Sequence, residues 1–389
     1  MKICDLTQFY SPVSGGVRRY LGQKAACLRR LGDGYRHVLV VPGETTSCQG
    51  DEFARVYTIA SPLISRTSRY RALLKLHLVE EILERECPDI IESGDPYQLA
   101  WKASASGRAL DIPVTGFYHS HFPEALLRTV KKFSGRVLPV IAEDVARRYV
   151  KALYNRFETT FVPSPALAGL LQSWGVESVE SVDLGVDVGV FSPGSEPIPA
   201  LRMRLGLPTN QKILLYVGRL APEKNVITLF KAFRLLRKRR RDLHLVVIGD
   251  GTQRAPLERT LRATQSVTWI PYCADSPVLA DYYRAADLFV HPGIQETFGL
   301  VTIESQACGT PVVGIRGSYM DRIIFSDQFA WARENTPNSL AEAMTSSLTS
   351  DLRGHGRAAS ETVRARFSWE QTFSRILSSY ERIIASYSP

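Results

Sequence analysis

The sequence predicts an α/β fold with two domains, each built on a parallel β-sheet, and three observations lead to this prediction. The chain has 389 residues, which is more than one hydrophobic core usually organises. Short runs rich in β-branched residues alternate with stretches of helical length, a pattern typical of parallel sheets that helices cover on both faces. After a polar linker the same alternation starts again, so we expect two similar, Rossmann-like domains.

Five segments of the first half are expected to be buried strands: residues 2–6, 37–41, 89–92, 114–118 and 160–162. Helices are expected to begin near Val17, Ser68, Pro96 and Pro165. The last two have strong start signals, because Asp95 and Ser164 are favourable N-cap residues and a proline follows each of them.

The second half repeats this pattern, with strands expected at residues 212–217, 243–248, 267–270, 288–291 and 311–314. A stretch rich in Gly, Pro and Ser over residues 185–199 marks the linker between the halves. We therefore predict an N-terminal domain over residues 1–190 and a C-terminal domain over residues 191–367. A last helix over residues 368–389 follows, and a return to the first domain is one option for it.

Composition indicates a soluble globular protein, since 44% of the residues are hydrophobic and 22% are charged. No apolar run approaches the roughly 20 residues that a bilayer-spanning helix needs. The first residues enter a strand-like segment without a secretory signal, so we expect a cytoplasmic location. The six cysteines are scattered without metal-binding spacing, which predicts reduced thiols and no metal site.

The formal net charge of +9 is concentrated in part in one run, from Arg237 to Arg241. We expect this run at the end of a helix, where cations suit the negative end of the dipole and face solvent. No aromatic stacking groups or recognisable binding module accompany it, so no nucleic-acid partner is expected.

Two adjacent glycines, Gly15 and Gly16, follow the first predicted strand and precede a helix. Such a turn lets backbone approach a ligand closely, and the helix N-terminus offers N–H groups to an anion. The alternative is an ordinary tight turn between strand and helix. The dinucleotide fingerprint GxGxxG appears nowhere in the chain, which argues against an NAD enzyme.

Two cations lie just beyond the first strand of the second domain, Arg219 at the strand end and Lys224 near the start of the next helix. Ligands of open α/β sheets bind outside the carboxyl ends of the strands. An arginine fork and a lysine point charge in that place can neutralise a diphosphate, so we expect an anion site rather than an inert surface pair.

The segment HPGIQETFGLVTIE, residues 291–304, combines a strand end, a glycine-containing loop and an apolar helix. Glu296 lies in the loop, Glu304 lies about one turn into the helix, and the backbone N–H groups near Gly299, Leu300 and Val301 form an anion cradle at the helix start. The two glutamates could then reach sugar hydroxyls and a ribose. The alternative is two solvated glutamates around an ordinary helix start.

Together, the motifs GGV (15–17), GRLAPEKN (218–225), GDG (249–251) and ETFGLVTIE (296–304), with the linker LGVDVGVFSP (184–193), resemble family 4 of the retaining glycosyltransferases. The resemblance runs in order from about residue 10 to 370. It implies the GT-B fold, in which two Rossmann-like domains face each other across a cleft. By this resemblance, residues 1–190 would form the acceptor-side domain and residues 191–367 the domain that binds the nucleotide-sugar donor.

The resemblance also implies roles for individual residues. Arg219 and Lys224 would hold the donor diphosphate, Glu296 would contact the donor sugar hydroxyls, and Glu304 would bind the ribose. The remaining donor-site candidates are Gly15, Gly16, Asp250, Phe298, Gly299, Leu300 and Val301. His119 matches the active-site histidine of the family, and His121 is its close competitor.

No Asp-x-Asp sequence occurs in the chain, in agreement with a family that needs no bound metal for the leaving diphosphate. We therefore expect no metal and no cofactor, with the nucleotide-diphosphate sugar as co-substrate. The resemblance implies a retaining, metal-independent hexosyltransferase acting on a lipid or cell-envelope glycan. The alternatives are a non-catalytic nucleotide-sugar-binding partner subunit, and a nucleotide-sugar hydrolase or epimerase on the same fold.

Residues 101–160 hold ten Lys or Arg against five Asp or Glu. Within them Leu126, Val130 and Phe133 recur near helical spacing beside Lys131 and Lys132. A basic amphipathic helix of this kind can dock on anionic lipid, which would make the protein peripheral at the inner face of the membrane. The alternative is that the apolar residues pack on the core and the cations are merely solvated.

Overall fold

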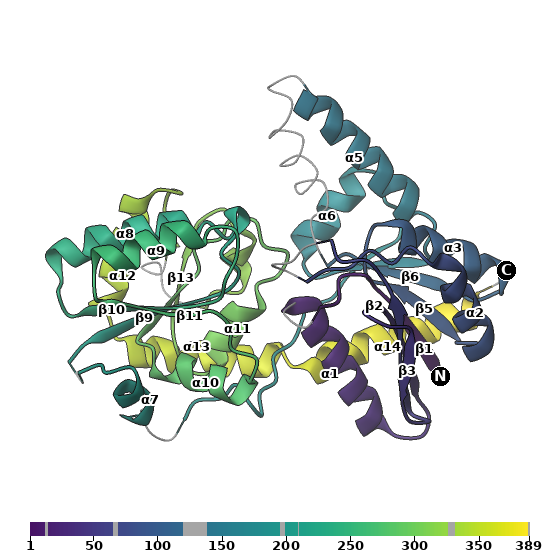
Figure 1. The fold of residues 1–389 in the computed structure, drawn as a ribbon, viewed down its shortest axis with the longest axis horizontal. Helices are drawn as coiled ribbons and strands as arrows, with labels where there is room; N and C mark the ends of the chain where they lie inside the picture. The colour runs from purple at the N-terminus through teal and green to yellow at the C-terminus, as the bar shows by residue number, and fades with distance from the viewer. Residues whose placement is uncertain are drawn as a thin grey trace. The chain divides into compact units, whose positions relative to one another are not determined.

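The chain divides into two units in the computed structural model, which describes residues 1–11, 15–64, 69–119, 138–194, 199–208, 210–325 and 331–387 (Figure 1). The first unit consists of residues 1–183 together with residues 369–389. The second unit consists of residues 184–368. Each unit has its own sheet and core, and each is described by itself.

An eight-stranded sheet in the order β3-β4-β2-β1-β5-β6-β7-β8 forms the centre of the first unit. Its strands are β1 (Lys2–Leu6), β2 (Arg36–Gly43), β3 (Ser47–Gly50), β4 (Ala54–Ala60), β5 (Ile90–Ser93), β6 (Val114–Phe117), β7 (Thr159–Val162) and β8 (Val179–Ser181). Every neighbouring pair is parallel except β3 and β4.

The five strands expected in the first half are confirmed, whereas β3, β4 and β8 were missed. In β4, buried and half-exposed residues alternate, and β3 and β8 contain no fully buried residue. These strands therefore lack the continuous apolar run by which the buried strands of a parallel sheet are found.

The helices of the first unit are α1 (Gly16–Leu31), α2 (Leu76–Glu86), α3 (Gln98–Ala109), α5 (Leu138–Tyr154), α6 (Pro165–Ser173) and α14 (Trp369–Ser386). The start of α6 is as predicted, with the Ser164 hydroxyl accepting a hydrogen bond from the Leu167 N–H at 3.3 Å. The prediction that Asp95 caps a helix starting at Pro96 was wrong. The carboxylate of Asp95 instead accepts hydrogen bonds from the N–H groups of Gln8 and Tyr97, and α3 begins later.

One predicted helix start falls on a residue that the structure does not describe. A helix was expected to begin near Ser68, which lies outside the described residues, and α2 begins at Leu76. The start of α1 at Gly16, with Gly15 as N-cap, agrees within one residue with the expected start near Val17.

The second unit is built on a six-stranded parallel sheet in the order β11-β10-β9-β12-β13-β14. Its strands are β9 (Lys212–Val217), β10 (Leu243–Ile248), β11 (Val267–Ile270), β12 (Leu288–Val290), β13 (Val312–Ile315) and β14 (Trp331–Ala332). The five expected strands are confirmed, and only the two-residue β14 was missed.

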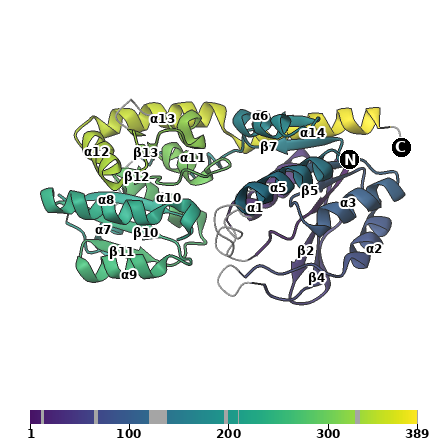
Figure 2. The same ribbon diagram turned by 90° about the horizontal axis from the view of Figure 1, so that it is seen from above.

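Helices and 3-10 turns connect these strands: α7 (Pro199–Arg204), η1 (Pro222–Lys224), α8 (Val226–Arg239), α9 (Arg254–Ala263), α10 (Ser276–Ala285), α11 (Leu300–Ala307), η2 (Tyr319–Arg322), α12 (Pro337–Leu348) and α13 (Leu352–Arg366). The basic run from Arg237 falls at the end of α8, as expected. Helices α8 and α12 pack side by side on the sheet (Figure 2).

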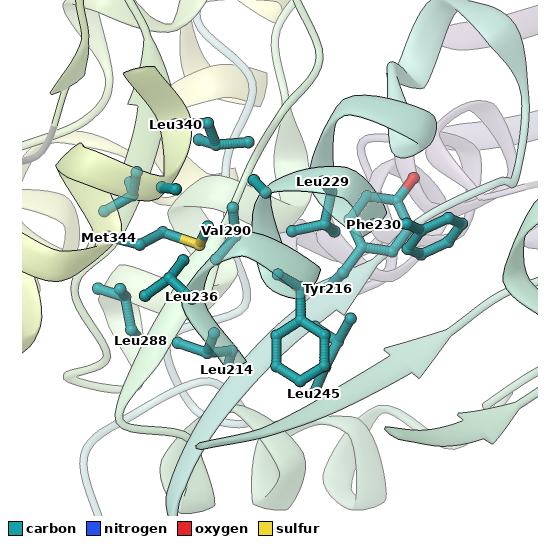
Figure 3. Packing of buried hydrophobic residues seen from close by; sticks show 14 of the residues in the cluster. Leu214, Tyr216, Leu229, Phe230, Leu236, Leu245, Leu288, Val290, Leu340 and Met344 are labelled. Carbon is teal, nitrogen blue, oxygen red and sulfur yellow. The ribbon is translucent and has the colours of Figure 1, made fainter. Parts of the chain in front are cut away.

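The core beneath α8 and α12 holds the central strands in place (Figure 3). Helix α8 contributes apolar residues at helical spacing, among them Leu229, Phe230 and Leu236, which pack against Leu214 of β9 and Met344 of α12. Burial of each such side chain stabilises the fold by about 1.5–3 kcal/mol. This packing fixes β9 and β12, two of the strands whose ends carry candidate donor residues.

The two units part between Asp183 and Leu184, earlier in the chain than the predicted boundary after residue 190. Residues beyond Asp183 are held by the second unit. The Val186 N–H donates to the Phe367 carbonyl at 2.8 Å, and the Arg284 guanidinium donates to the carbonyls of Val190 and Ser192. The described residues 184–192 are thus attached to the second unit and do not form a free linker.

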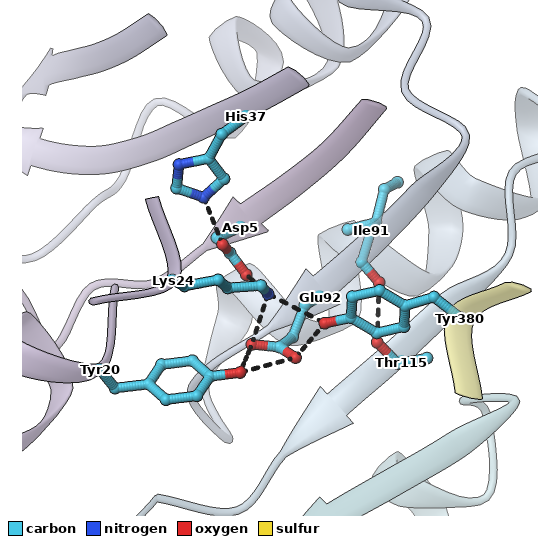
Figure 4. Close-up of polar contacts among 8 residues, drawn as sticks. All are labelled: Asp5, Tyr20, Lys24, His37, Ile91, Glu92, Thr115 and Tyr380. Atoms are coloured by element: carbon cyan, nitrogen blue, oxygen red, sulfur yellow. Dashed lines mark hydrogen bonds and ion pairs between the residues drawn. The ribbon is translucent and has the colours of Figure 1, made fainter. Parts of the chain in front are cut away.

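A buried ionic network ties the sheet of the first unit to its helices (Figure 4). The Lys24 ammonium of α1 lies 2.7 Å from the Asp5 carboxylate of β1, 3.3 Å from the Glu92 carboxylate of β5 and 2.9 Å from the Tyr380 hydroxyl of α14. Asp5, Lys24 and Glu92 are almost completely buried. Helix α14, remote in sequence, is therefore part of the same polar cluster as β1 and β5.

Further groups complete this network. The His37 imidazole lies 2.6 Å from Asp5, and the hydroxyls of Tyr20 and Tyr380 donate to Glu92. Burial alone would raise the pKa of Asp5, but Lys24 and His37 hold that pKa well below its usual range. Burial raises the pKa of Glu92 to about 7, although Lys24 opposes the rise.

Replacing Lys24→Met should destabilise the protein by about 3–5 kcal/mol, because it leaves two buried carboxylates without their cation. The control is Arg30→Gln, which breaks the ion pair between Arg30 of α1 and Glu370 of α14. Both partners of that pair are 59% exposed, so its loss should cost under about 1 kcal/mol. Urea and thermal unfolding measure both variants, and equal losses would contradict the role given to Lys24.

Candidate active site

Most of the candidate donor residues gather at one edge of the sheet in the second unit. Arg219 and Lys224 follow β9, Asp250 follows β10, and Glu296 follows β12. The three strands are parallel neighbours, with β9 between the other two. Their carboxyl ends therefore meet at the same edge, where ligands of open α/β sheets bind.

The loops after β9 and β10 touch through backbone, and glycine makes this contact possible. Gly249 has a φ of 137°, and a Cβ atom built on it would lie 2.0 Å from the Gly218 carbonyl oxygen. A Cβ on Gly251 would lie 2.4 Å from the Leu220 carbonyl oxygen. The Leu220 N–H also donates to the Asp250 carbonyl at 3.0 Å, so the two loops are fixed to each other.

The side chain of Asp250 stabilises its own loop in this structure. Its carboxylate accepts a hydrogen bond from the Gly251 N–H at 2.7 Å and lies 3.8 Å from the Arg254 guanidinium. The Trp269 indole donates to the Gly249 carbonyl at 2.8 Å from the other side. A direct contact of Asp250 with the donor stays a prediction.

The two predicted phosphate-binding cations differ in their surroundings. Arg219 is largely exposed and pairs with Glu223 at 3.1 Å, while its carbonyl accepts a hydrogen bond from the Tyr216 hydroxyl at 2.9 Å. Lys224 ends the 3-10 turn η1 and forms an ion pair with Glu296. The structure thus brings Lys224 and Glu296 together, and it places the Arg219 side chain in a separate, more exposed pair with Glu223.

Glu296 is nearly buried, and two basic side chains contact the same one of its oxygens, Oε1. These are the Lys224 ammonium and, at 3.4 Å, Nε2 of His291. Burial alone would raise the pKa of Glu296, but Lys224 and His291 hold that pKa well below its usual range. Glu296 is therefore a carboxylate that can only accept hydrogen bonds.

His291 was given no role in the sequence analysis, although it lies at the end of a predicted strand and five residues before Glu296. It is buried, with 3% of its surface exposed. The sequence does carry a signal that could have identified His291, since it directly follows a buried strand and precedes an acidic residue in the next loop.

The helix start after Gly299 agrees with the sequence prediction, and the binding of an anion there stays a prediction. Gly299 has a φ of 90° and is the N-cap of α11, so Leu300 and Val301 form the first turn. The first N–H groups of a helix lack helical partners and can receive an anion. The Phe298 side chain is buried and leaves only its backbone for a ligand.

Glu304 lies in α11 and is 1% exposed, and its carboxylate accepts a hydrogen bond from the Tyr283 hydroxyl at 3.1 Å. It is thus not a solvated surface residue, which was the alternative given for this position. Its contact with a ribose stays a prediction.

His119 follows β6 in the first unit and packs among aromatic rings. Its imidazole stacks on Phe117, with ring centroids 4.1 Å apart, and meets the Tyr20 ring edge-on at 4.9 Å. Burial lowers the pKa of His119 to about 3, so the ring is neutral near pH 7. A neutral imidazole there can exchange hydrogen bonds with a substrate but supplies no positive charge. Its competitor, His121, lies outside the described residues.

Gly15, the N-cap of α1, has open space around it in the described part of the protein. A Cβ on Gly15 would meet no atom within 4 Å, so nothing inside the described part of the protein requires glycine at this position. The approach of Gly15 and Gly16 to a donor phosphate stays a prediction.

Within the ranges that the structure describes, no group of three or more His, Cys, Asp or Glu side chains could hold a metal ion. All six cysteines are free thiols.

Both halves of the chain match models of known protein families. The model described as Glycosyltransferase Family 4 matches residues 14–190, and the model described as Glycosyl transferases group 1 matches residues 197–364. The two matches fall in order and together span most of the chain. The chain belongs to glycosyltransferase family 4, and it is a glycosyltransferase with the GT-B fold.

Relatives and solved structures agree with this assignment. The chain is 28% identical over 379 residues to a GDP-mannose-dependent alpha-(1-6)-phosphatidylinositol dimannoside mannosyltransferase of Mycobacterium tuberculosis, covering 97% of this chain and 95% of the relative. It is also 28% identical over 398 residues to a GDP-mannose-dependent alpha-mannosyltransferase of Corynebacterium glutamicum, covering 99% and 90%. Sucrose-phosphate synthase from Thermosynechococcus elongatus shares the fold, with a TM-score of 0.78, 21% identity and 99% of each chain covered.

Proposed function

We propose that this glycosyltransferase moves mannose from GDP-mannose to a membrane glycolipid, with retention of the anomeric configuration and without a metal ion. The observation that carries the proposal is the similarity over nearly the whole chain to two mannosyltransferases named as GDP-mannose-dependent. The name of the first of these also supplies the acceptor class, a mannosylated phosphatidylinositol.

The donor site of the proposal is the sheet edge of the second unit. Lys224 and Arg219 neutralise the diphosphate, and the first N–H groups of α11 bind its oxygens. Charges and dipoles fixed in advance at the leaving group stabilise its departure without rearranging, which is commonly the largest catalytic contribution. These groups take the place that a metal ion holds in other sugar transferases, so the proposed reaction needs none.

Glu296 and Glu304 bind the sugar and the ribose in this proposal, and neither is a nucleophile. Glu296 is held as a carboxylate by Lys224 and His291, which suits it to accept hydrogen bonds from sugar hydroxyls. Retention then follows from attack on the same face that the diphosphate leaves, with a departing phosphate oxygen accepting the acceptor proton. His119 of the first unit is the proposed active-site histidine.

The test of the function is a transfer assay with GDP-mannose and a phosphatidylinositol mannoside in detergent. We expect a new lipid-linked α-mannoside in the presence of EDTA as well as in its absence. Two results would contradict the proposal in different ways. Hydrolysis of GDP-mannose without any transfer would favour a nucleotide-sugar hydrolase, and loss of activity in EDTA that manganese or magnesium restores would refute metal independence.

Variants of the proposed site should separate donor binding from turnover. Lys224→Ala and Arg219→Ala should each weaken GDP-mannose binding by about 1.5–3 kcal/mol, because a charge-assisted bond to the diphosphate is lost. His119→Ala should lower kcat with little effect on donor affinity, as expected for an interaction made mainly in the transition state.

Calorimetry and steady-state kinetics measure these effects, and Lys231→Ala, which removes an exposed cation of α8, is the control. Unchanged donor affinity in both site variants would remove the diphosphate assignment. A normal His119→Ala enzyme beside a crippled His121→Ala enzyme would exchange the roles of the two histidines.

A peripheral membrane contact is the remaining part of the proposal. The predicted amphipathic segment around Lys131 and Lys132 lies outside the described residues. In the described part of the first unit, Leu63, Ile64 and Leu74 are exposed by 45%, 66% and 63%, within a stretch that also carries Arg69 and Lys75. Among the described helices, none combines the length and apolar character needed to cross a bilayer.

Co-sedimentation with liposomes tests this contact. Binding should rise with anionic lipid and fall with salt, since each cation near the surface adds about 1 kcal/mol. Changing Lys131, Lys132 and Arg136 to glutamine should weaken it. The same change at Lys238, Arg239 and Arg241, in the basic run of the second unit, removes equal charge and should have little effect. Absence of binding to anionic vesicles at low salt would favour a soluble or carrier-bound acceptor.

A further inference from the structure

His291 occupies a position between the core of the second unit and the donor loop. It follows β12 directly, is 3% exposed, and its Nε2 atom lies 3.4 Å from Oε1 of Glu296. Its other ring nitrogen, Nδ1, is buried without a hydrogen-bond partner among the described residues. Buried nitrogens of this kind are rare in proteins, so an unpaired one calls for an explanation.

The carboxylate of Glu296 can only accept hydrogen bonds, so Nε2 of His291 faces it as an N–H group. Nδ1 is the other ring nitrogen, and no hydrogen bond to a described residue compensates for its desolvation. The protein thus tolerates a cost at Nδ1 and keeps Nε2 directed to Glu296.

The loop after β12 is shaped closely around this pair. A Cβ on Gly293 would lie 3.0 Å from Cε1 of His291 and 3.4 Å from Oε1 of Glu296, closer to the ring carbon than side-chain contacts normally come. The Asn225 amide donates to the Pro292 carbonyl at 2.9 Å and holds the loop from its other side. The imidazole is therefore confined between the strand end and the loop, in one orientation.

Both contacts of Glu296 fall on one oxygen. The Lys224 ammonium and the His291 ring bind Oε1, and no described residue bonds Oε2. A lysine is a point charge on a flexible stem and does not by itself set the rotation of a carboxylate. The confined imidazole of His291 contacts Oε1 from a second direction. Together, the two contacts fix the rotation of the Glu296 carboxylate and therefore the direction in which Oε2 points.

We propose that His291 is a positioning residue for sugar recognition: through Oε1 it orients Glu296 so that Oε2 accepts a hydrogen bond from a hydroxyl of the donor hexose. The inference rests on the proposed donor site and names the part of the donor that this pair recognises. Lys224 serves the diphosphate as well as Glu296, whereas His291 affects the sugar alone. A site built to bond a hydroxyl rejects sugars that lack it or present it elsewhere.

The test compares His291→Ala with His291→Gln, because the glutamine amide can place an N–H near the position of Nε2. We expect His291→Ala to weaken binding of GDP-mannose about tenfold or more, the loss of a hydrogen bond to a charged group, and to change the affinity for GDP by less than about threefold. His291→Gln should restore most of the affinity for GDP-mannose. Titration calorimetry with the two ligands on the whole protein measures the difference.

A matched control separates positioning from folding. His244 of β10 is also buried and bonds the Thr268 hydroxyl at 2.8 Å, on a strand rather than in the donor loop. His244→Ala should lower the melting temperature as His291→Ala does, and it should leave the ratio of GDP-mannose to GDP affinity unchanged.

The outcomes distinguish this inference from the proposed function. If His291→Ala weakens GDP and GDP-mannose equally, or weakens neither, the positioning role is overturned and the donor site stands. If the wild-type protein binds UDP-glucose instead of GDP-mannose, the same comparison of UDP-glucose with UDP decides the inference, and only the proposed donor fails. If no nucleotide sugar binds, both the proposed function and this inference fall.

Discussion

One buried cation organises the first unit, and most of that unit depends on it. The Lys24 ammonium sits among β1, β5 and α14 in a place that an apolar residue would fill at less desolvation cost. The network favours a single arrangement of its side chains, because each carboxylate and hydroxyl in it is bonded to a specific partner. Tyr20 extends this order outward, since its hydroxyl bonds Glu92 and its ring packs against His119.

The second unit uses the same chemistry in an open form. Lys24 is buried, and its charge is balanced by carboxylates inside the fold. Lys224 and His291, in contrast, contact only one oxygen of Glu296. A carboxylate that is held at one oxygen and has no partner at the other among the described residues is suited to a ligand rather than to stability. The ion pairs of Lys24 and Lys224 thus differ in how many of their hydrogen-bonding positions the described residues fill.

Local signals in the sequence predicted the elements, and tertiary contacts decided the exceptions. Ser164 caps α6 through a hydrogen bond within the first turn of that helix, so the local sequence was enough to predict it. The Asp95 carboxylate instead accepts a hydrogen bond from the N–H of Gln8, which is remote in sequence, and it caps no helix. The candidate donor residues could be assigned to one sheet edge because parallel strands end together. Their pairing could not be predicted, since Lys224 and Glu296 stand 72 residues apart, and neither could the bond of Lys24 to Tyr380 across 356 residues.

The membership of α14 in the first unit has a consequence for the order in which the protein is made. Chains emerge from the ribosome from the N-terminus and usually fold domain by domain as they do so. Here the whole second unit, residues 184–368, is synthesised before Trp369–Ser386 can reach the sheet that begins with β1. The unit that starts first is thus completed last, and until then Lys24 and Glu92 lack the hydroxyl of Tyr380. In a nascent chain the second unit would be complete while the first unit still lacked its final helix.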